Sequence, residues 1–551
     1  MDMIQIEDLT VAFSGKAAVE NVNLTLQDGE ILGVVGESGS GKSVTALTLM
    51  GLLNEEAQVV SGRILFDGEA LLEAGKARDK DLYRKYQGAK MSMVFQEPMT
   101  SLNPTQRVGK QAAEMLKLHA SLTKEEIYKK VLEVFASVGL RDVETVYESY
   151  PHQLSGGMRQ RVMIAMAVIL HPRLIVADEP TTALDVTIQN QIIELLARIN
   201  KEQKNTMLFI THDLNLARRI CHRIAVMKDG KVVEIGDTKE VFLNPKEDYT
   251  KKLIEAVPSR MKKRKKAQMI ITAEEHLDLS GGSTPHETME NDMTEKAAPI
   301  LEVRDLNVYY QEGSNSLFGR DKKRRVVENA TFDIKMGEIM GLVGESGCGK
   351  TSLSRAILGM NKDIQGEVVS RSKGSQMIFQ DPYSSLNPAK TIGWLLQEPL
   401  RAQGRLDSSK KMTPADMEAA AYEMLQKVGM EEYYFHRRPS QLSGGQRQRV
   451  SIGQALITRP MLVIADEPVS ALDVTLQAQI MELMRSLQEE LHLSYLFISH
   501  DINVIYQMSD RIMVIQKGRI VEIGDTEEVF ENPKEEYTKL LLAESVPAAW
   551  Q

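Results

Sequence analysis

Two stretches of the sequence decide the fold: Gly36-Glu-Ser-Gly-Ser-Gly-Lys42-Ser43 and Gly344-Glu-Ser-Gly-Cys-Gly-Lys350-Thr351. Each stretch follows an apolar, strand-like run and precedes a helical pattern, a context in which Gly-x-x-x-x-Gly-Lys-Ser/Thr predicts a phosphate-binding loop. Backbone N–H groups at a helix start hold phosphate oxygens, and glycines let the phosphates come close. We expect Lys42 and Lys350 to reach the terminal phosphates of a nucleotide. The hydroxyls that follow them, on Ser43 and Thr351, would ligate Mg²⁺. The remaining loop residues expected to line the nucleotide are Gly36, Ser38, Gly39, Gly41, Gly344, Ser346, Gly347 and Gly349.

The two loops belong to an internal duplication. Four further strings recur in the same order: Val94–Pro98 and Ile378–Pro382, Leu154–Gly157 and Leu442–Gly445, Ala177–Pro180 and Ala465–Pro468, and Thr211–Asp213 and Ser499–Asp501. A repeat of this length predicts two copies of one domain. We place the first copy at residues 1–257, a linker at 258–299 and the second copy at 300–551. Copy one carries 24 extra residues around Glu69 to Gly88, which we interpret as a surface excursion.

The expected linker lacks helical or strand periodicity. It contains a basic run, Lys262–Lys266, and then an acidic stretch interrupted by Gly281–Pro285. This composition favours a flexible tether. The basic run could instead contact lipid headgroups, but seven acidic residues in the same segment favour a solvated linker.

Composition and charge exclude several classes of protein. The 551 residues are 42% hydrophobic and 26% charged, within the globular range, and carry a formal net charge of −9. Because duplex binding rests on clustered cations, this charge argues against nucleic acid as the main ligand. Two cysteines, Cys221 and Cys348, are too few for a disulfide framework or a zinc ribbon. No window approaches the roughly 20 apolar residues of a membrane span, so we expect a protein that is soluble or membrane-bound through partners.

The periodicity within each copy predicts an α/β core. Strand-like runs at Ile31–Val35, Leu174–Ala177 and Met207–Ile210 alternate with helical patterns, as in a mostly parallel sheet with crossover helices. Thr123-Lys-Glu-Glu126 and Thr413-Pro-Ala-Asp416 are capping-box strings that open helices with one apolar face. Each copy is therefore expected to insert a helical subdomain into its α/β core.

Further polar groups are expected beside the nucleotide. Asp178 and Asp466 end apolar strands and precede Glu-Pro, a pattern that predicts an acid holding Mg²⁺. Glu179 and Glu467 would then be the general bases for the attacking water. Leu-Ser-Gly-Gly predicts a second anion site at a helix N-terminus, because the serine caps the helix and the glycines expose N–H donors. Its residues are Ser155, Gly156, Gly157, Ser443, Gly444 and Gly445.

The ordered set of phosphate loop, Gln96 or Gln380, Leu-Ser-Gly-Gly, Asp-Glu-Pro, Ala-Leu-Asp and Thr/Ser-His-Asp resembles the nucleotide-binding domain of ABC transporters. The resemblance covers nearly the whole of both copies. It implies two tandem ABC domains in one chain, ATPase activity with ATP and Mg²⁺, and head-to-tail closure of the two domains over two ATPs.

The resemblance also implies two composite sites. Site one would use Lys42, Ser43, Gln96, Asp178, Glu179 and His212, with Ser443, Gly444 and Gly445 opposite. Site two would use Lys350, Thr351, Gln380, Asp466, Glu467 and His500, with Ser155, Gly156 and Gly157 opposite. The glutamines would serve both Mg²⁺ and catalysis, and the histidines would serve catalysis. By the same resemblance, Asp185 and Asp473 would lie at the domain interface, and Phe13 and Tyr310 would stack on adenine.

Three positions depart from the family pattern without removing a catalytic group. Met158 stands where copy two has Gln446, Phe13 replaces the commoner tyrosine, and Cys348 lies inside a phosphate loop. We interpret Cys348 as a small packing residue. The alternative is that the helix N-terminus lowers its pKa and makes it oxidisable.

Longer strings resemble one branch of the family, the peptide and nickel importers. These strings are Phe95–Pro104, Phe379–Pro388 and the tails Asn244–Thr250 and Asn532–Thr538. The two copies resemble the two partner ATPases of that branch, fused. The resemblance implies two transmembrane permease subunits, an extracytoplasmic solute-binding protein and a peripheral location on the cytoplasmic face of the inner membrane. Peptides, glutathione, nickel and metal chelates all stay open as cargo.

The alternative is a soluble tandem ABC ATPase that acts on ribosomes as a translation factor. Such proteins typically join their halves by a long charged helix, whereas the segment 258–299 is broken by glycine and proline. A DNA-repair ATPase would need long coiled-coil or zinc insertions, which the sequence lacks. The Ser-Leu-Asn-Pro strings favour the importer.

Overall fold

The computed structural model describes residues 2–54, 56–76, 79–97, 101–182, 184, 186–257, 298–312, 322–372, 374–470 and 472–545. The chain divides into two compact units, unit 1 built from Met1–Val257 and unit 2 almost entirely from the chain that follows. Of the expected linker, only Ala298 and Pro299 lie within the described residues.

The described residues of unit 1 form two sheets. The larger runs in the order β10 (Lys231–Asp237), β9 (Arg223–Lys228), β3 (Ile31–Val35), β8 (Thr206–Thr211), β7 (Leu174–Asp178) and β6 (Met91–Val94). Its strands are parallel except for β10, which confirms the predicted mostly parallel core. The smaller, antiparallel sheet runs β2 (Lys16–Gln27), β1 (Asp2–Phe13), β4 (Ala57–Phe66) and β5 (Glu69–Glu73). All five residues of β3 are buried, as expected for a central strand covered on both faces.

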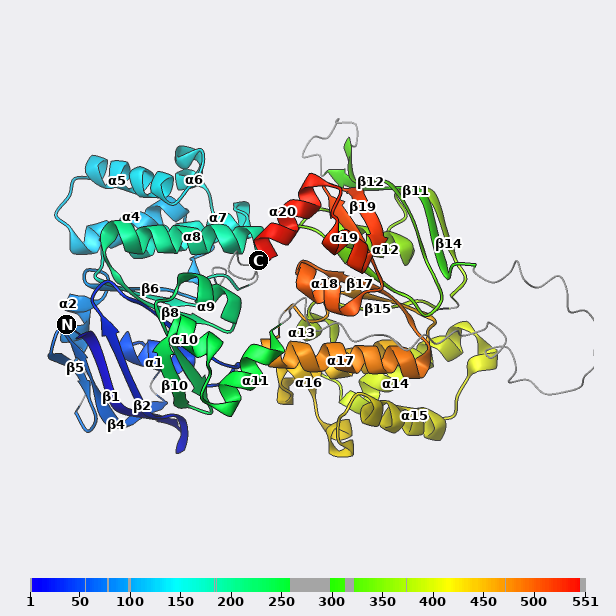
Figure 1. Ribbon diagram of the computed structural model, residues 1–551, viewed down its shortest axis with the longest axis horizontal. Coiled ribbons are helices and arrows are strands. Elements are labelled where there is room, and N and C mark those ends of the chain that lie inside the picture. Colours follow the sequence, from blue (N-terminus) through cyan, green and yellow to red (C-terminus); the bar gives the residue numbers. More distant parts are fainter. Residues whose placement is uncertain are drawn as a thin grey trace, which may run out of the picture. The chain divides into compact units, whose positions relative to one another are not determined.

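The helices of unit 1 fall into a core set and an inserted set (Figure 1). The core set is α1 (Lys42–Leu49), α2 (Lys80–Tyr86), α8 (Val186–Gln203), α9 (Leu214–Ile220), α10 (Thr238–Leu243) and α11 (Asp248–Ala256). The inserted set is α4 (Val108–His119), α5 (Lys124–Ser137), α6 (Val143–Glu148) and α7 (Gly156–Val168), which pack on one another. A capping box between Thr123 and Glu126 starts α5, so the predicted helical subdomain is confirmed.

Unit 2 repeats this architecture. Its larger sheet runs β15 (Gln376–Ile378), β16 (Leu462–Asp466), β17 (Ser494–Ser499), β13 (Ile339–Val343), β18 (Arg511–Gln516) and β19 (Arg519–Asp525), and its smaller sheet runs β12 (Lys322–Ile334), β11 (Leu301–Glu312) and β14 (Ile364–Ser370). Its helices are α12 (Lys350–Ile357), α13 (Pro382–Ser385), α14 (Ile392–Leu406), α15 (Pro414–Lys427), α16 (Gly444–Leu456), α17 (Val474–Leu491), α18 (Ile502–Met508), α19 (Thr526–Glu531) and α20 (Glu536–Ser545). The inserted helices α14, α15 and α16 pack together, and Thr413 and Asp416 form the predicted capping box of α15.

Parallel pairing brings the functional strings of each unit to one sheet edge. In unit 1, Val35 at the end of β3 pairs with Thr211 of β8, and Asp178 of β7 pairs with Ile210. The phosphate loop, Asp-Glu-Pro and Thr-His-Asp therefore all leave the sheet at the carboxyl ends of neighbouring strands. Ligands of open α/β sheets bind at this edge.

The extra segment of unit 1 is not the surface excursion that we expected. Residues Glu69–Glu73 add strand β5 to the smaller sheet, and Leu71 is buried there. Tyr83 and Tyr86 of α2 are also buried, and the Tyr86 ring meets the Phe66 ring edge-on with centroids 5.0 Å apart. These aromatic and aliphatic side chains join the core, because burying them removes apolar surface from water.

Candidate nucleotide site

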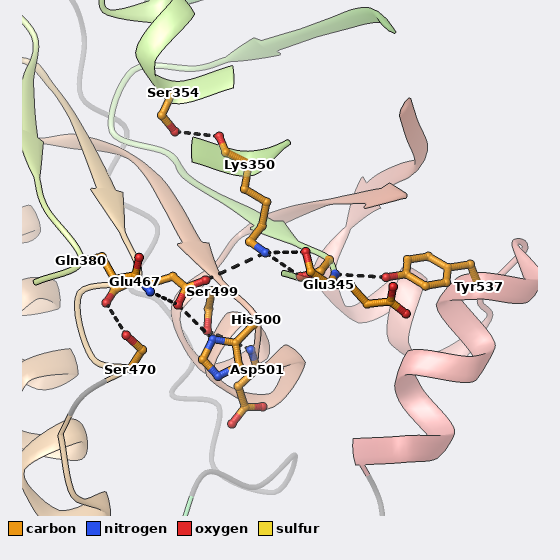
Figure 2. Close-up of polar contacts among 11 residues, drawn as sticks. Glu345, Lys350, Ser354, Gln380, Glu467, Ser470, Ser499, His500, Asp501 and Tyr537 are labelled. Carbon is orange, nitrogen blue, oxygen red and sulfur yellow. Dashed lines mark hydrogen bonds and ion pairs between the residues drawn. The ribbon is translucent and has the colours of Figure 1, made fainter. Parts of the chain in front are cut away.

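The phosphate-loop lysine of each unit is folded against its own loop. Lys42 Nζ donates hydrogen bonds to the carbonyl oxygens of Gly36 and Glu37, at 2.8 and 2.7 Å. Lys350 Nζ makes the matching hydrogen bonds to the first two carbonyls of its loop, at 2.7 and 2.9 Å (Figure 2). Both lysines are buried, and burial lowers the pKa of Lys42. Each lysine is thus held at the start of its helix, where an anionic phosphate would bind.

A hydroxyl and a carboxylate lie together beside each lysine. Ser43 Oγ donates to Oδ1 of Asp178 at 3.1 Å. Burial raises the pKa of Asp178 to about 6, although the Ser43 hydrogen bond opposes this shift. In unit 2, burial likewise raises the pKa of Asp466, and the Thr351 hydroxyl opposes it. Hydroxyl and carboxylate oxygens are the donors that Mg²⁺ prefers, so the predicted ligands fit this ion.

Three side chains converge on the carboxylate of Glu179. Gln96 Nε2 and Thr182 Oγ1 each donate to Oε2 at 2.9 Å, and His212 Nδ1 lies 3.1 Å from Oε1. Burial alone would raise the pKa of Glu179, but the hydrogen bond and charge of His212 lower it. The pKa of His212 is raised, because Glu179 outweighs the effect of burial. The carboxylate is therefore kept ionised and able to accept a proton.

Unit 2 repeats this cluster with one difference. Gln380 Nε2 donates to Oε2 of Glu467 at 3.0 Å, and His500 Nδ1 lies 3.1 Å from the same oxygen (Figure 2). Lys350 Nζ lies 3.9 Å from Oε1. Ser470, which matches Thr182, donates instead to the backbone oxygen of Glu467 at 3.1 Å. Thr182 was not predicted as a site residue, although its position three residues after Glu179 could have suggested this contact.

Both glutamates have a strained backbone. Glu179 and Glu467 have φ of +45° and +49°, in the left-handed region that side chains other than glycine rarely adopt. The N–H of Glu179 donates to the Ile210 carbonyl at 2.9 Å, and that of Glu467 to the Ile498 carbonyl at 3.0 Å. A cost of about 1–2 kcal/mol at each position fits residues held in place for function.

The Leu-Ser-Gly-Gly strings start helices in both units, as predicted. Ser155 caps α7 by accepting a hydrogen bond from the Met158 N–H at 3.3 Å. Ser443 caps α16 in the same way, and Gln446 also accepts from the Ser443 N–H at 3.0 Å. Methionine lacks the amide oxygen of glutamine, so α7 has no such reciprocal bond.

The remaining predicted residues are Phe13 and Tyr310, expected beside adenine, and the two interface aspartates, Asp185 and Asp473. Phe13 ends β1 and is partly buried, whereas Tyr310 on β11 is 37% exposed. Asp473 directly precedes α17, and Asp185 lies outside the described residues. Cys348 packs in the core and burial raises its pKa, so the packing interpretation holds and the lowered pKa was wrong.

Comparison with known proteins supports the resemblance to ABC transporters that the motifs indicate. The family model described as "ABC transporter" matches residues 19–182 and 327–470. That described as "Oligopeptide/dipeptide transporter, C-terminal region" matches residues 233–282 and 521–550. The chain is 41% identical to the glutathione import ATP-binding proteins GsiA of Salmonella paratyphi A and Salmonella typhimurium, covering 100% of this chain and 90% of each relative. It is 40% identical to GsiA of Escherichia coli K12 with the same coverage.

Among solved structures, cbiO1 from Clostridium perfringens, part of the ABC transporter complex cbiONQ, is 29% identical over 44% of this chain and 91% of its own, with a TM-score of 0.39. Within the described part of the chain, no helix has the length and apolar character needed to cross a membrane. The resemblance inferred from the motifs is confirmed by the family matches and by the full-length relatives. The chain belongs to the ABC transporter family, with two tandem nucleotide-binding domains, and is the ATP-hydrolysing subunit of an importer.

Proposed function

We propose that this chain drives the import of small peptide-like solutes, a class that includes dipeptides, oligopeptides and glutathione. The observation that carries this proposal is the match to the oligopeptide/dipeptide transporter C-terminal region behind both nucleotide-binding domains. Full-length similarity to glutathione import ATP-binding proteins supports it. We assign the first domain to residues 1–257, the linker to 258–299 and the second domain to 300–551.

The side chains of unit 1 supply the parts of an ATP-hydrolysing site. Lys42 and the loop N–H groups would bind the terminal phosphates, and Glu179 would take the proton of the attacking water. His212 holds the carboxylate in its ionised form, and Gln96 orients it. Lys350, Glu467, His500 and Gln380 would play the same roles in unit 2. Bound Mg²⁺, held by Ser43, Gln96 and Asp178 or by Thr351, Gln380 and Asp466, would neutralise phosphate charge.

Closure of the two domains would complete these sites. In the proposed closed state, Ser443, Gly444 and Gly445 face the phosphate loop of unit 1, and Ser155, Gly156 and Gly157 face that of unit 2. Asp185 and Asp473 would lie at the closed interface, and Phe13 and Tyr310 on the adenines. ATP binding would close the domains and hydrolysis would reopen them, so that motion passes to membrane subunits.

A methionine-lined cavity of about 280 Å³ in unit 1 suits a membrane partner. It lies where β6 meets α4 and α7, next to Phe95 and so beside Gln96. Its methionines are Met50, Met91, Met93, Met115, Met163 and Met166. Methionine side chains adapt to the shape of an inserted apolar segment. We assign the cavity to a cytoplasmic segment of a permease subunit, which would hold the chain at the inner membrane.

The matching positions of unit 2 have a different character. Three of the lining methionines, Met115, Met163 and Met166, correspond to Pro399, Ser451 and Gln454 on α14 and α16. An apolar segment that fits unit 1 would therefore fit unit 2 less well. This difference supports two distinct permease subunits rather than two copies of one.

The proposal is tested by purifying the tagged chain from gently solubilised native membranes and identifying the co-purifying proteins by mass spectrometry. Two different polytopic permeases would support it, and their linked solute-binding protein could then be screened for cargo. Ribosomal proteins without permeases would overturn it in favour of a translation factor.

A substitution in the cavity sharpens this test. Met115→Glu places a charge in the cavity and should remove at least one permease from the purified complex while basal ATP hydrolysis persists. Leu118→Glu is the matched control, because Leu118 lies on the same helix but is 70% exposed. Equal permease recovery with both variants would contradict the assignment of the cavity.

A further inference from the structure

The tail of each unit contains a tyrosine that the roles above do not use. The tails Asn244–Thr250 and Asn532–Thr538 have nearly the same sequence, Asn-Pro-Lys-Glu-Asp/Glu-Tyr-Thr. Tyr249 is the second residue of α11, and Tyr537 is the second residue of α20. Both side chains pack against the core of their unit.

Each tyrosine hydroxyl accepts a hydrogen bond from the phosphate loop. The N–H of Glu345 donates to the Tyr537 hydroxyl at 3.1 Å (Figure 2). In unit 1, the N–H of Glu37 donates to the Tyr249 hydroxyl at 3.4 Å, a longer bond. The two members of each pair lie about 200 residues apart in sequence, so the tail returns to the loop only in the folded unit.

This hydrogen bond and the lysine contact involve the same peptide group. The N–H of Glu345 and the carbonyl of Gly344 share one planar peptide unit, in which they point in opposite directions. Lys350 Nζ donates to that carbonyl at 2.7 Å while the tyrosine receives the N–H. Fixing the N–H on one side therefore fixes the carbonyl that holds the lysine on the other. Lys42, Gly36 and Tyr249 repeat this arrangement in unit 1.

The glycine of this peptide has no side chain that could fix it. A Cβ on Gly344 would lie 2.2 Å from the Ile515 carbonyl oxygen, and one on Gly36 would lie 2.2 Å from that of Met227. The close approach of the loop to the neighbouring strand thus excludes side chains at this position. The hydroxyl of the tail tyrosine can hold this peptide in place of a side chain on the glycine.

A carboxylate from the sheet holds the helix that carries each tyrosine. Glu522 on β19 accepts hydrogen bonds from the backbone N–H groups of Lys534 and Glu535, at 2.9 and 3.2 Å. Glu234 on β10 accepts from the corresponding two N–H groups before α11, at 2.9 and 3.2 Å. These donors lie at a helix start, where backbone N–H groups lack helical partners. Each carboxylate therefore ties the start of the tail helix to the sheet.

We propose that Tyr249 and Tyr537 are positioning residues for ATP hydrolysis, which orient the first peptide of each phosphate loop. They keep the lysine and the loop N–H groups arranged for the triphosphate. This inference rests on the ATP-hydrolysing activity of the chain and is independent of the transported solute. It gives the tail of each unit a role in the nucleotide site of that unit.

The test is the double variant Tyr249→Phe/Tyr537→Phe of the full chain, which keeps both rings and removes both hydroxyls. The loop N–H groups would lose their acceptors, so the KM for ATP should rise about 3- to 10-fold, the effect of losing one modest hydrogen bond. The maximal rate should change less than about twofold, because Glu179 and Glu467 are untouched. The Kd of a fluorescent ATP analogue should rise in parallel. Of the two single variants, Tyr537→Phe should raise the KM for ATP more than Tyr249→Phe, since the hydrogen bond of Tyr537 is shorter.

The matched control is Tyr495→Phe, which removes a buried hydroxyl with no hydrogen-bond partner among the described residues. It should leave the KM for ATP unchanged. The proposal fails if the double variant binds ATP with wild-type affinity. It also fails if the tyrosine double variant loses ATP affinity only together with a large loss of thermal stability, and Glu234→Gln/Glu522→Gln loses both in the same way. In that case the tyrosines would only hold the tail helix in place. Because binding is measured on the purified chain, failure here leaves the permease test of the import proposal unaffected.

Discussion

Replacing Glu179 and Glu467 by glutamine tests the assignment of the catalytic base. Glutamine has nearly the shape of glutamate, so the strained backbone at φ of +45° and +49° need not change. Two of the three contacts to Glu179, from Gln96 and Thr182 at 2.9 Å, reach Oε2, which the amide oxygen can replace. The third contact, from His212 at Oε1, would meet the amide nitrogen instead. The double variant therefore keeps the backbone and, in unit 1, the Gln96 and Thr182 contacts, and it loses the negative charge and the proton acceptor.

The expected loss follows from the role of the carboxylate. A general base contributes about 10²- to 10⁴-fold to a rate, so turnover of the double variant should fall at least about tenfold and at most by that upper value. ATP binding should stay intact, with a Kd within about threefold of wild type. Loss of the carboxylate 3.9 Å from Lys350 Nζ removes an attraction for the lysine and also a repulsion for the triphosphate.

Turnover is measured as phosphate release at saturating Mg²⁺ and ATP, and binding as the fluorescence change of an ATP analogue. Glu418→Gln is the control for the substitution itself, because Glu418 is exposed on α15. Near-normal hydrolysis by the double variant would refute the base assignment. Loss of both binding and turnover would refute the view that these carboxylates act only in the chemical step.

Three further predictions concern stability. Tyr83→Ala should destabilise unit 1 by about 3–5 kcal/mol in urea unfolding, and a loss below about 1 kcal/mol would restore the surface-excursion interpretation. Ser443→Ala should lower the melting temperature more than Ser155→Ala, because Ser443 shares a capping box with Gln446; equal shifts would contradict this account. Burial opposes ionisation of Glu522, but its hydrogen bonds hold its pKa below the ordinary 4.5. The stabilisation of the fold by ionised Glu522 is complete above about pH 4.5 and is lost as pH falls through the lower pKa of the folded state. The difference in melting temperature between wild type and Glu522→Gln should therefore shrink on acidification. A difference that stays constant with pH would contradict this prediction.

Local sequence patterns predicted the parts of the fold that depend on neighbours in the chain. The capping boxes at Thr123 and Thr413 and the fully apolar run Ile31–Val35 have the predicted structures. The site clusters were predictable because parallel strands bring their carboxyl ends to one edge. Motif order therefore placed Asp178 and His212 near the phosphate loop.

Long-range contacts could not be predicted in this way. The extra segment of unit 1 was misinterpreted because its buried residues, Leu71, Tyr83 and Tyr86, are spread over a strand and a short helix without a clear period. The hydrogen bond from Glu37 to Tyr249 joins residues far apart in sequence. Only the folded chain shows that the tail tyrosine meets the phosphate loop.

The central claim is that ATP hydrolysis by this chain drives solute import, and transport by the purified complex in lipid vesicles tests it most directly. The complex with its permeases is reconstituted, ATP is supplied on the side of this chain, and the solute-loaded binding protein on the other. We predict solute movement across the membrane together with faster ATP hydrolysis, both abolished by Glu179→Gln/Glu467→Gln. Hydrolysis that is indifferent to permeases and binding protein, without solute movement, would contradict the account.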